Sequence, residues 1–357
     1  MSRKEVLFQY YYEHIRHNIV NFLKWLVLAV LTGLIVGGAS GIFAKCIGAA
    51  TAYRDAHIRI FLLLPFAGLL IVFLYQKLGS QDGGTNQVLA TIKSKDKIPF
   101  ISAPLIFLST LLTHLTGGSA GREGASIQFG GSLGSWLGKL AKLDEFDQHV
   151  MIMCGMSAAF AAVFGTPMAA AVFAMEVASV GVMYYAALFP CMIASIIASR
   201  FADGMGVSPE TFLVVKVPEL TITNGLKIGL VAVGCSFLSI LFCILLKYTS
   251  KFYQKYLKNP YLRVFAAACI IIAVTALLNT RDYMGAGGNL ITRAIEEGQA
   301  GPLDFLWKMI LTALTMRAGY RGGEIVPAFS IGATFGCVAG GLLGLSPGLS
   351  AAAGMAA

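Results

Sequence analysis

The amino-acid sequence predicts an all-α integral membrane protein, organised as an inverted-repeat bundle of many tilted and broken helices. Hydrophobic residues make up 57% of the 357 residues and charged residues 13%. Soluble domains typically contain about 25% charged residues, so a soluble fold would have too few charges to cover a surface in water. A series of apolar segments indicates several membrane helices, and an internal repeat indicates two related halves.

The first apolar segment is long enough to cross a membrane. Residues 25–44 carry no charged side chain, and a spanning helix needs roughly 20 apolar residues. Several later segments are short or interrupted by glycine and proline, which is tolerated at membrane depth only where the backbone lines a cavity or is buried in protein. We therefore expect broken helices around a pathway. The later segments are residues 60–75, 98–115, 150–175, 182–199, 228–246, 264–278, 305–316 and 325–357.

The charge balance indicates where the loops lie. The chain has 27 Lys and Arg against 18 Asp and Glu, a formal net charge of +9. Basic patches with interleaved aromatic residues are absent, so we expect no nucleic-acid partner; basic cytoplasmic loops in contact with anionic lipids explain the charge. We predict a multi-pass protein of the cell membrane (the inner membrane in a bacterium) with an interfacial N-terminal helix (1–24), a first membrane repeat (25–202) and a second (203–357).

An internal repeat relates the two halves. A shift of 202 residues aligns residues 105–138 with 307–340, and eight of the 34 positions are identical, five of them glycine and two threonine. Residues 84–86 and 155–158 match residues 287–289 and 354–357 at offsets of 203 and 199. Two inverted halves are typical of membrane transporters. The first half continues past residue 159 into another apolar helix, so we expect the corresponding helices of the second half to lie beyond residue 357.

One carboxylate lies where a helix begins inside the membrane. Glu123 belongs to the sequence Gly-Arg-Glu-Gly at residues 121–124, between two apolar segments. An ionised group there is costly unless it is paired, and the free amides of a helix start favour an anion. Glu123 therefore either caps its helix or pairs with Arg122, or its carboxylate occupies an anion site and leaves it when protonated or displaced by a mobile anion.

Two further glycine-rich segments begin short apolar helices. Residues 322–327 occupy the matching place in the second half, with Pro327 aligned to Ala125, and residues 83–86 add a hydroxyl donor. Three such helix starts can converge near the midplane and bind an anion with partial charges alone, so that it is not trapped by a full charge.

These motifs resemble those of the CLC family of chloride channels and proton-coupled anion exchangers. The family signatures G-S-G-I-P, G-R-E-G-P and G-x-F-x-P correspond to residues 84–88, 121–125 and 323–327, and the second is the most specific. The resemblance extends from about residue 25 to residue 357. It implies a CLC-type fold, transport of chloride or a similar small anion, with protons as a possible second substrate, no cofactor or metal, and a homodimer.

By position, the resemblance implies a role for each motif residue. Glu123 corresponds to the gating glutamate, and Thr85 stands where the family has a serine whose hydroxyl binds the central anion. The backbone amides of Gly124, Ala125, Ile325 and Val326 would complete the anion sites. The remaining residues that support these motifs are Gly84, Gly121, Arg122, Gly323 and Pro327.

Some positions depart from the common pattern. Glu324 replaces an apolar residue and Val88 a proline, and both changes resemble the fluoride-exporting branch of the family, although that branch commonly has another residue at the position of Thr85. The family's inner proton-transfer glutamate falls on Val177, and the neighbouring Glu176 is turned away by about 100° on a helix. We therefore predict channel-like or poorly coupled transport, with exchange assisted by a proton on Glu324 as the rival.

Two other classes of protein are less compatible with the sequence. An intramembrane serine protease could use Ser119 with His114, but Ala120 stands where that motif has glycine. A non-transporting scaffold would leave Glu123 and Glu324 without a purpose. The predicted function is therefore glutamate-gated anion transport rather than enzymatic catalysis, with a fluoride-selective proton antiporter as the alternative.

Overall fold

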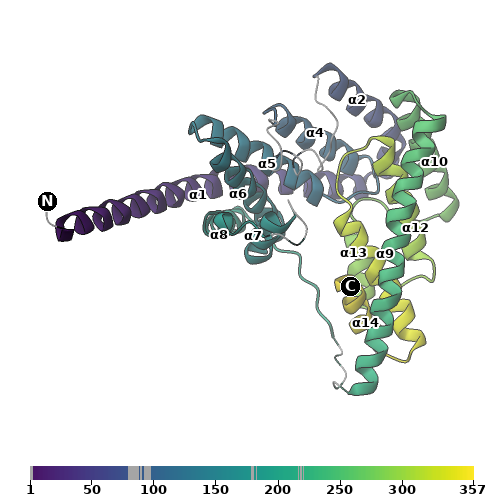
Figure 1. Cartoon of the computed structure of the whole chain (residues 1–357). Coiled ribbons are helices and arrows are strands. Elements are labelled where there is room, and N and C mark those ends of the chain that lie inside the picture. The colour runs from purple at the N-terminus through teal and green to yellow at the C-terminus, as the bar shows by residue number, and fades with distance from the viewer. Residues whose placement is uncertain are drawn as a thin grey trace. The chain divides into compact units, whose positions relative to one another are not determined.

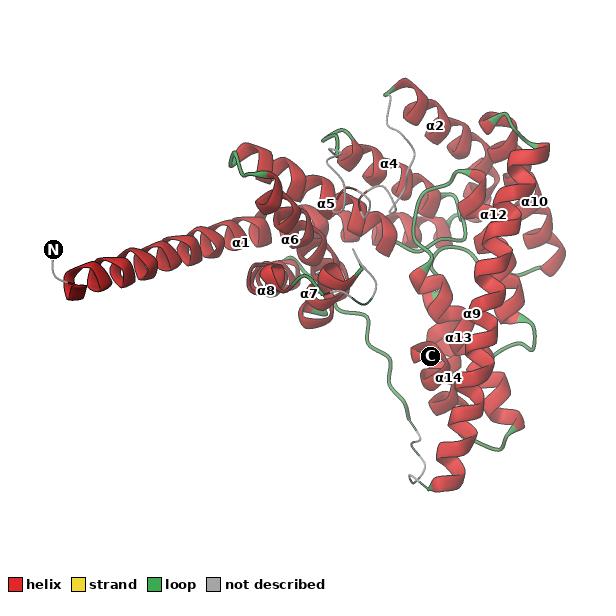
Figure 2. Cartoon of the chain, viewed as in Figure 1, coloured by secondary structure: helices red, strands yellow, loops and turns green. Residues whose placement is uncertain are grey.

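The computed structural model describes residues 3–78, 88, 91, 98–177, 181, 183–215, 217, 219 and 221–357. Within these residues the secondary structure is helical, as Figure 2 shows, and the single β-type contact is an isolated bridge between Gly121 and Gly323. The all-α prediction is confirmed. The helices, labelled in Figure 1, are α1 (Arg3–Ala56), α2 (Leu64–Lys77), α4 (Ser102–Leu115), α5 (Glu123–Leu140), α6 (Glu145–Phe164), α7 (Pro167–Glu176), α8 (Leu188–Gly204), α9 (Ile222–Tyr256), α10 (Pro260–Leu278), α11 (Gly288–Ile295), α12 (Asp304–Ala318), α13 (Ile325–Leu342) and α14 (Pro347–Ala356), with short 3-10 helices η1 (Ile58–Leu63) and η2 (Tyr185–Ala187).

Long apolar helices alternate with short ones. Among the described residues, 7 helical segments are long and apolar enough to cross a membrane, and α4 and α7 are shorter apolar helices. This mixture is the pattern of complete and broken helices that the sequence predicts, and it makes the chain a multi-pass membrane protein. The 7 segments are Tyr12–Ala56, Ile58–Lys77, Glu145–Phe164, Tyr185–Gly204, Ile222–Tyr256, Pro260–Leu278 and Ile325–Leu342.

The N-terminal helix is continuous. Helix α1 has 54 residues, which corresponds to about 80 Å at the usual rise per residue, against about 30 Å for the hydrocarbon core of a bilayer. The boundary that we predict at residue 24 therefore falls inside one helix. The location of residues 1–24 at the membrane surface stays a prediction.

The chain forms two compact units that interleave in sequence. The first comprises Met1–Ile42, Thr85–Ala103 and Ser126–Pro209, and within it α6 packs on α7 and α8. The second comprises Phe43–Gly84, Pro104–Ala125 and Glu210–Ala357. In this unit α13 packs on α14, α12 and α9, and α10 packs on α2 (Figure 1). These units group residues by spatial contact and do not test the predicted boundary between the sequence repeats after residue 202, which stays a prediction.

In the first unit, helices α5 and α6 cross at glycines. A Cβ added at Gly130 would collide with the carbonyl oxygen of Gly155, and one added at Gly134 with that of Met151. Lipid-embedded helices associate through close packing rather than through hydrophobic exclusion from water, so small residues at the crossing are required. These glycines set the distance between α5 and α6.

In the second unit, α13 and α14 cross in the same way. A Cβ at Gly332 would collide with the carbonyl oxygen of Gly354, and one at Gly336 with that of Ser350. The repeat alignment matches residues 332, 336 and 354 to the α5 and α6 glycines at residues 130, 134 and 155. Glycines at matching positions in the two halves therefore allow the same close crossing of two helices.

Two threonines make reciprocal contacts in the second unit. The Oγ1 of Thr315 accepts a hydrogen bond from the amide of Ser119 at 3.2 Å, and the Oγ1 of Thr113 accepts one from the amide of Arg321 at 3.3 Å. Both pairs of matched residues are 202 positions apart. Reciprocal contacts are what a local two-fold relation produces. They support two related halves, whose inverted orientation in the membrane stays a prediction.

The close crossing of α13 and α14 can be tested by substitution of one of its glycines. We expect Gly332→Ala to lower the free energy of unfolding by about 1–3 kcal/mol, because the new methyl group must push α14 away from α13. The measurement is thermal unfolding of the purified protein in detergent. Gly341→Ala in the same helix is the matched control, because nothing lies within 4 Å of its added Cβ. Equal melting temperatures for the two variants would contradict the assignment.

Candidate functional site

Two helix starts meet at a pair of glycines. Gly121 and Gly323 exchange two backbone hydrogen bonds, each with an N···O distance of 2.8 Å. These residues are matched by the sequence repeat, and each lies two residues before the start of a helix: α5 begins at Glu123 and α13 at Ile325. The unpaired amides of the first turn of both helices are thereby brought close together, and this produces a region of positive potential without a charged side chain.

The carboxylate of Glu123 occupies this region. Its side chain is fully buried, and Oε1 accepts a hydrogen bond from the amide of Val326 at 3.1 Å. The amides of Ile325 and of Glu123 itself also stabilise the carboxylate. The second oxygen, Oε2, has no hydrogen-bond partner among the described residues. We call the amides of residues 325 and 326, with the glycines at 121 and 323, the amide cage.

The cage has no room for a side chain at its two glycines. A Cβ at Gly121 would collide with both carboxylate oxygens of Glu123. A Cβ at Gly323 would collide with Oε1 and would lie 2.6 Å from the amide nitrogen of Gly124. Ala125, in the first turn of α5, is fully buried. Glycine at these positions is therefore a requirement of space around the carboxylate.

The Glu123 side chain accepts its hydrogen bond from another helix. Arg122 forms its ion pair with Glu210, at 2.5 Å, and lines a separate pocket. Glu123 instead bonds to the first turn of another helix, α13, more than 200 residues away in sequence. The carboxylate thus combines contacts at its own helix start with a hydrogen bond to a second helix start, and its role stays a prediction.

The second predicted acid lies outside the cage. Glu324, the residue before α13, is about one-third exposed, and it forms an ion pair with Arg317 at 2.5 Å. Pro327 is buried in the first turn of the same helix. The structure thus brings Glu123, Gly323 and Val326 together and leaves Glu324 at the margin.

Other predicted residues are in different positions. Gly84 and Thr85 lie outside the described residues. Glu176 is exposed at the end of α7, and Val177 follows it directly.

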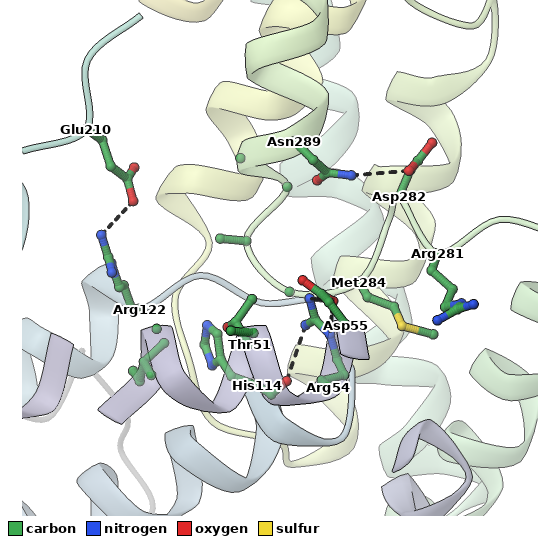
Figure 3. Close-up of a pocket in the computed structure, with 17 residues that line it drawn as sticks. Thr51, Arg54, Asp55, His114, Arg122, Glu210, Arg281, Asp282, Met284 and Asn289 are labelled. Atoms are coloured by element: carbon green, nitrogen blue, oxygen red, sulfur yellow. Dashed lines mark hydrogen bonds and ion pairs between the residues drawn. The ribbon is translucent and has the colours of Figure 1, made fainter. Parts of the chain in front are cut away.

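A pocket with a volume of about 570 Å³ borders the second unit's glycine-rich loop (Figure 3). Arg54, Arg122 and Arg281 line it, together with the backbone of residues 284–289. The guanidinium of Arg54 donates to the carbonyl oxygen of His114 at 3.2 Å, as the dashed line in Figure 3 marks. Asp55, Glu210 and Asp282 also line the pocket, and two of these acids form ion pairs with Arg54 and Arg122. Residues 287–289, the repeat counterparts of residues 84–86, therefore lie beside a wall of paired basic and acidic side chains.

Sequence reasoning missed Arg54, Arg281 and Lys308. Lys308 is fully buried in α12, within the segment of residues 305–316 that we predicted as apolar. A lysine inside an apolar membrane segment was the available signal, because such residues are costly and commonly functional. Arg54 carried a weaker signal as a charge at the end of a long apolar helix.

The serine and histidine of the protease hypothesis have different partners. The Oγ of Ser119 bonds to the hydroxyl of Thr312 at 3.0 Å, and Nδ1 of His114 bonds to the carbonyl oxygen of Thr110 at 2.9 Å. Ser119 is buried. The two side chains therefore do not form a nucleophile and base pair in this structure.

Comparisons with known proteins agree on one family. The family model described as voltage gated chloride channel matches residues 67–357. The chain is 34% identical over 342 residues to the chloride/fluoride channel protein of Pseudomonas syringae pv. tomato, covering 94% of this chain and 75% of that protein. It is 22% identical over 363 residues to the H(+)/Cl(-) exchange transporter ClcA of Vibrio cholerae, covering 93% of this chain and 77% of that protein.

Solved structures share the fold. The crystal structure of a CLC-type fluoride/proton antiporter matches with a TM-score of 0.89 and 32% identity, covering 94% of this chain and 85% of that chain. A slow cyanobacterial Cl-/H+ antiporter matches with a TM-score of 0.75 and 20% identity, covering 93% and 84%. The predicted fold class and resemblance are confirmed.

The contact between Gly121 and Glu123 can be tested by a double-mutant cycle. We expect Gly121→Ala to lower the free energy of unfolding by about 1–3 kcal/mol, because its methyl group displaces the carboxylate. In a Glu123→Ala background the same substitution meets no carboxylate, and we expect most of the cost to disappear. Thermal unfolding of the four proteins in detergent measures the coupling. Effects that add to within about 0.5 kcal/mol would contradict this contact.

Proposed function

Because the chain belongs to the voltage-gated chloride channel family, we propose that it exchanges fluoride for protons, with the Glu123 carboxylate as the gate. Family membership makes it a multi-pass membrane protein that transports chloride or a similar small anion, and not an enzyme. The protease and scaffold hypotheses are therefore rejected. We propose fluoride as the anion, coupling of its transport to protons, and the residue roles that follow.

The observation that carries the proposal is the buried carboxylate in the amide cage. A carboxylate and a halide both need N–H donors, and they compete for the same amides of Ile325 and Val326. When Glu123 takes up a proton, its attraction to these amides falls and the acid can leave the cage. Proton uptake and anion occupancy are then alternatives at one site, and this linkage couples the two ions.

Neutral donors suit a site that must release its ion. The amides of Gly124, Ala125, Ile325 and Val326 would bind the anion by partial charges after the carboxylate leaves, so the anion is held without a direct contact to a full charge. Thr85 and Gly84 would supply a hydroxyl and a turn at the next position along the path. No metal or cofactor is needed for this cycle.

We assign the pocket lined by Arg54, Arg122 and Arg281 as the entrance for the anion. An entering anion would compete with the carboxylates of Asp55 and Glu210 for the guanidinium groups that they pair with, and Arg122 precedes the gate in the chain. The ion pair between Arg122 and Glu210 sets how freely that guanidinium can reach an entering anion.

Two observations favour fluoride. Relatives at 34% and 32% identity are described as a chloride/fluoride channel protein and a fluoride/proton antiporter. Glu324 occupies a position that the common motif reserves for an apolar residue, and a second acid beside the cage offers a second proton site. A passive, channel-like cycle is the second candidate, because Val177 cannot carry a proton and the adjacent Glu176 is exposed.

We further propose a homodimer with one pathway in each protomer. Helix α9 leaves many large apolar side chains exposed, among them Leu226, Leu230, Phe237 and Ile240. A surface of this kind is covered by lipid tails or by a second copy. Basic loops at the membrane surface would contact anionic lipid headgroups.

The gate is tested by fluoride efflux from proteoliposomes at several pH values. We expect the wild-type rate to rise as the pH falls from roughly 7.5 to 4.5, the range around carboxyl titration in proteins. Glu123→Gln cannot gain a proton, so we expect fluoride passage without this pH dependence. Glu297→Gln, which neutralises an exposed carboxylate, is the control and keeps the wild-type profile. An unchanged profile in Glu123→Gln would sink the assignment.

Proton coupling is tested by uphill pumping. A fluoride gradient across the liposome should drive protons against their own gradient in the wild type, and Glu324→Gln should reduce this pumping at least about tenfold, which corresponds to about 1.4 kcal/mol in the coupled step. Fluoride flux itself should persist. Arg317→Gln is the comparison: it breaks the same ion pair but keeps the acid, so pumping should continue. Absence of pumping in the wild type would favour the channel-like cycle.

A further inference from the structure

A buried ammonium group lies near the amide cage and has no role in the proposed cycle so far. Lys308 in α12 is fully buried. Its Nζ donates hydrogen bonds to the carbonyl oxygen of Gly285 at 2.7 Å, to the Oγ of Ser119 at 3.1 Å and to the carbonyl oxygen of Tyr283 at 3.1 Å. These acceptors match the three hydrogens of an ammonium group. All three are neutral, so hydrogen bonding satisfies the donors and leaves the charge without a bonded counter-ion.

The contacts of Lys308 lead to Glu123: Ser119, which accepts a hydrogen bond from Nζ, lies two residues before Gly121, where an added Cβ would collide with the Glu123 carboxylate. Arg54, which bonds to the carbonyl oxygen of His114, adds a second positive charge to this region. Asp304, one turn earlier in α12, is already held by the hydroxyl of Tyr283 at 2.7 Å and by Arg293 at 3.1 Å. Burial and the bond to Asp304 raise the pKa of Tyr283, so its hydroxyl remains a donor. Glu123 is therefore the acid left to balance Lys308.

The remaining groups around α12 do not change this balance. His114 of α4 is also within electrostatic reach of Lys308. Arg263 of α10 bonds to the carbonyl oxygen of Ala318, and Glu324 before α13 pairs with Arg317, both near the other end of α12. Helix α9 contributes apolar side chains to its contact with α12.

The acceptors of Lys308 belong to the loops that build the cage. The carbonyl oxygen of Gly285 also accepts from the amide of Ala120 at 3.1 Å, and its amide donates to the carbonyl oxygen of Gly118 at 3.0 Å. Ala120 directly precedes Gly121, one of the two cage glycines. The carbon chain of Lys308 lies against Gly287, where an added Cβ would be 2.9 Å from Cε. The ammonium thus ties the loop of residues 283–287 to the segment that leads into the gate.

We propose that Lys308 is a positioning residue whose ammonium balances whichever anion fills the amide cage, the Glu123 carboxylate or the transported ion. The proposal rests on the gating role of Glu123. When the acid leaves as a neutral group, the ammonium is left without an opposite charge in the membrane interior, which is costly. Entry of an anion restores the balance. The lysine attracts the anion without touching it, because its three hydrogens are held by protein oxygens.

The test separates the charge from the hydrogen bonds. Lys308→Gln keeps side-chain donors and removes the charge, Lys308→Met removes both, and Lys308→Arg keeps the charge. For Gln and Met we expect about a tenfold weaker fluoride affinity by calorimetry, because an attractive charge at short range is lost. Their pH profile of fluoride efflux should also move to higher pH, because Glu123 is protonated more easily without the ammonium. Lys308→Arg should keep the wild-type fluoride affinity and the wild-type pH profile.

Each outcome decides the proposal. Lys251→Gln removes an exposed charge of α9 and is the matched control, with wild-type affinity and profile. If Lys308→Met fails to fold, the Gln and Arg variants still separate charge from packing. A Gln variant with wild-type affinity and pH profile overturns the role of the charge. If Glu123→Gln keeps its pH dependence, the gate fails instead, and calorimetry of the Lys308 variants still tests charge balance at the anion site.

Discussion

The burial of the Glu123 carboxylate among backbone amides is the interaction on which the rest of the site depends. A carboxylate without partners at membrane depth would be very costly. The first turn of α13 offsets that cost through the amide of Val326 and its neighbour, and the bridge between Gly121 and Gly323 brings the two helix starts together. Because the donors are backbone groups, their geometry is set by the helices and not by flexible side chains. The site is thereby organised before any ion arrives.

Glycine serves two distinct purposes in this fold. At residues 130, 134, 332 and 336 it permits close crossing of helices, which is the main source of association between helices in lipid. At Gly121 and Gly323 it leaves room for a carboxylate and not for another helix. The same residue type therefore sets both the close helix crossings and the space around the Glu123 carboxylate, and the repeat places each kind of glycine at matching positions in the two halves.

Charged side chains of the second unit that are close in sequence lie in different places in the structure. Arg122 and Glu123 are adjacent in sequence, yet the guanidinium lines the pocket and the carboxylate lies in the cage. Successive residues at a helix start point about 100° apart, so a single motif directs one side chain to the pocket and the next to the cage. Lys308 lies behind them, with its hydrogens committed to protein oxygens. In the proposed cycle, an anion that approaches the cage would be attracted by the Lys308 charge without contacting it.

The sequence by itself determined the fold class, the membrane location, the repeat and the candidate gate. Apolar composition, segment length, glycine spacing and a carboxylate at a helix start are local properties of the chain, and they lead to these conclusions without a structure. Tertiary structure decided which polar groups meet. It made α1 continuous through residue 24, where no residue marks a break, and it paired Arg122 with Glu210 and Glu324 with Arg317. It also buried Lys308 against loop residues that lie 23 to 189 positions away in sequence. The physical reason is that helix formation follows from neighbours along the chain, whereas a buried charge is stabilised by whichever donors and acceptors the folded helices bring within reach.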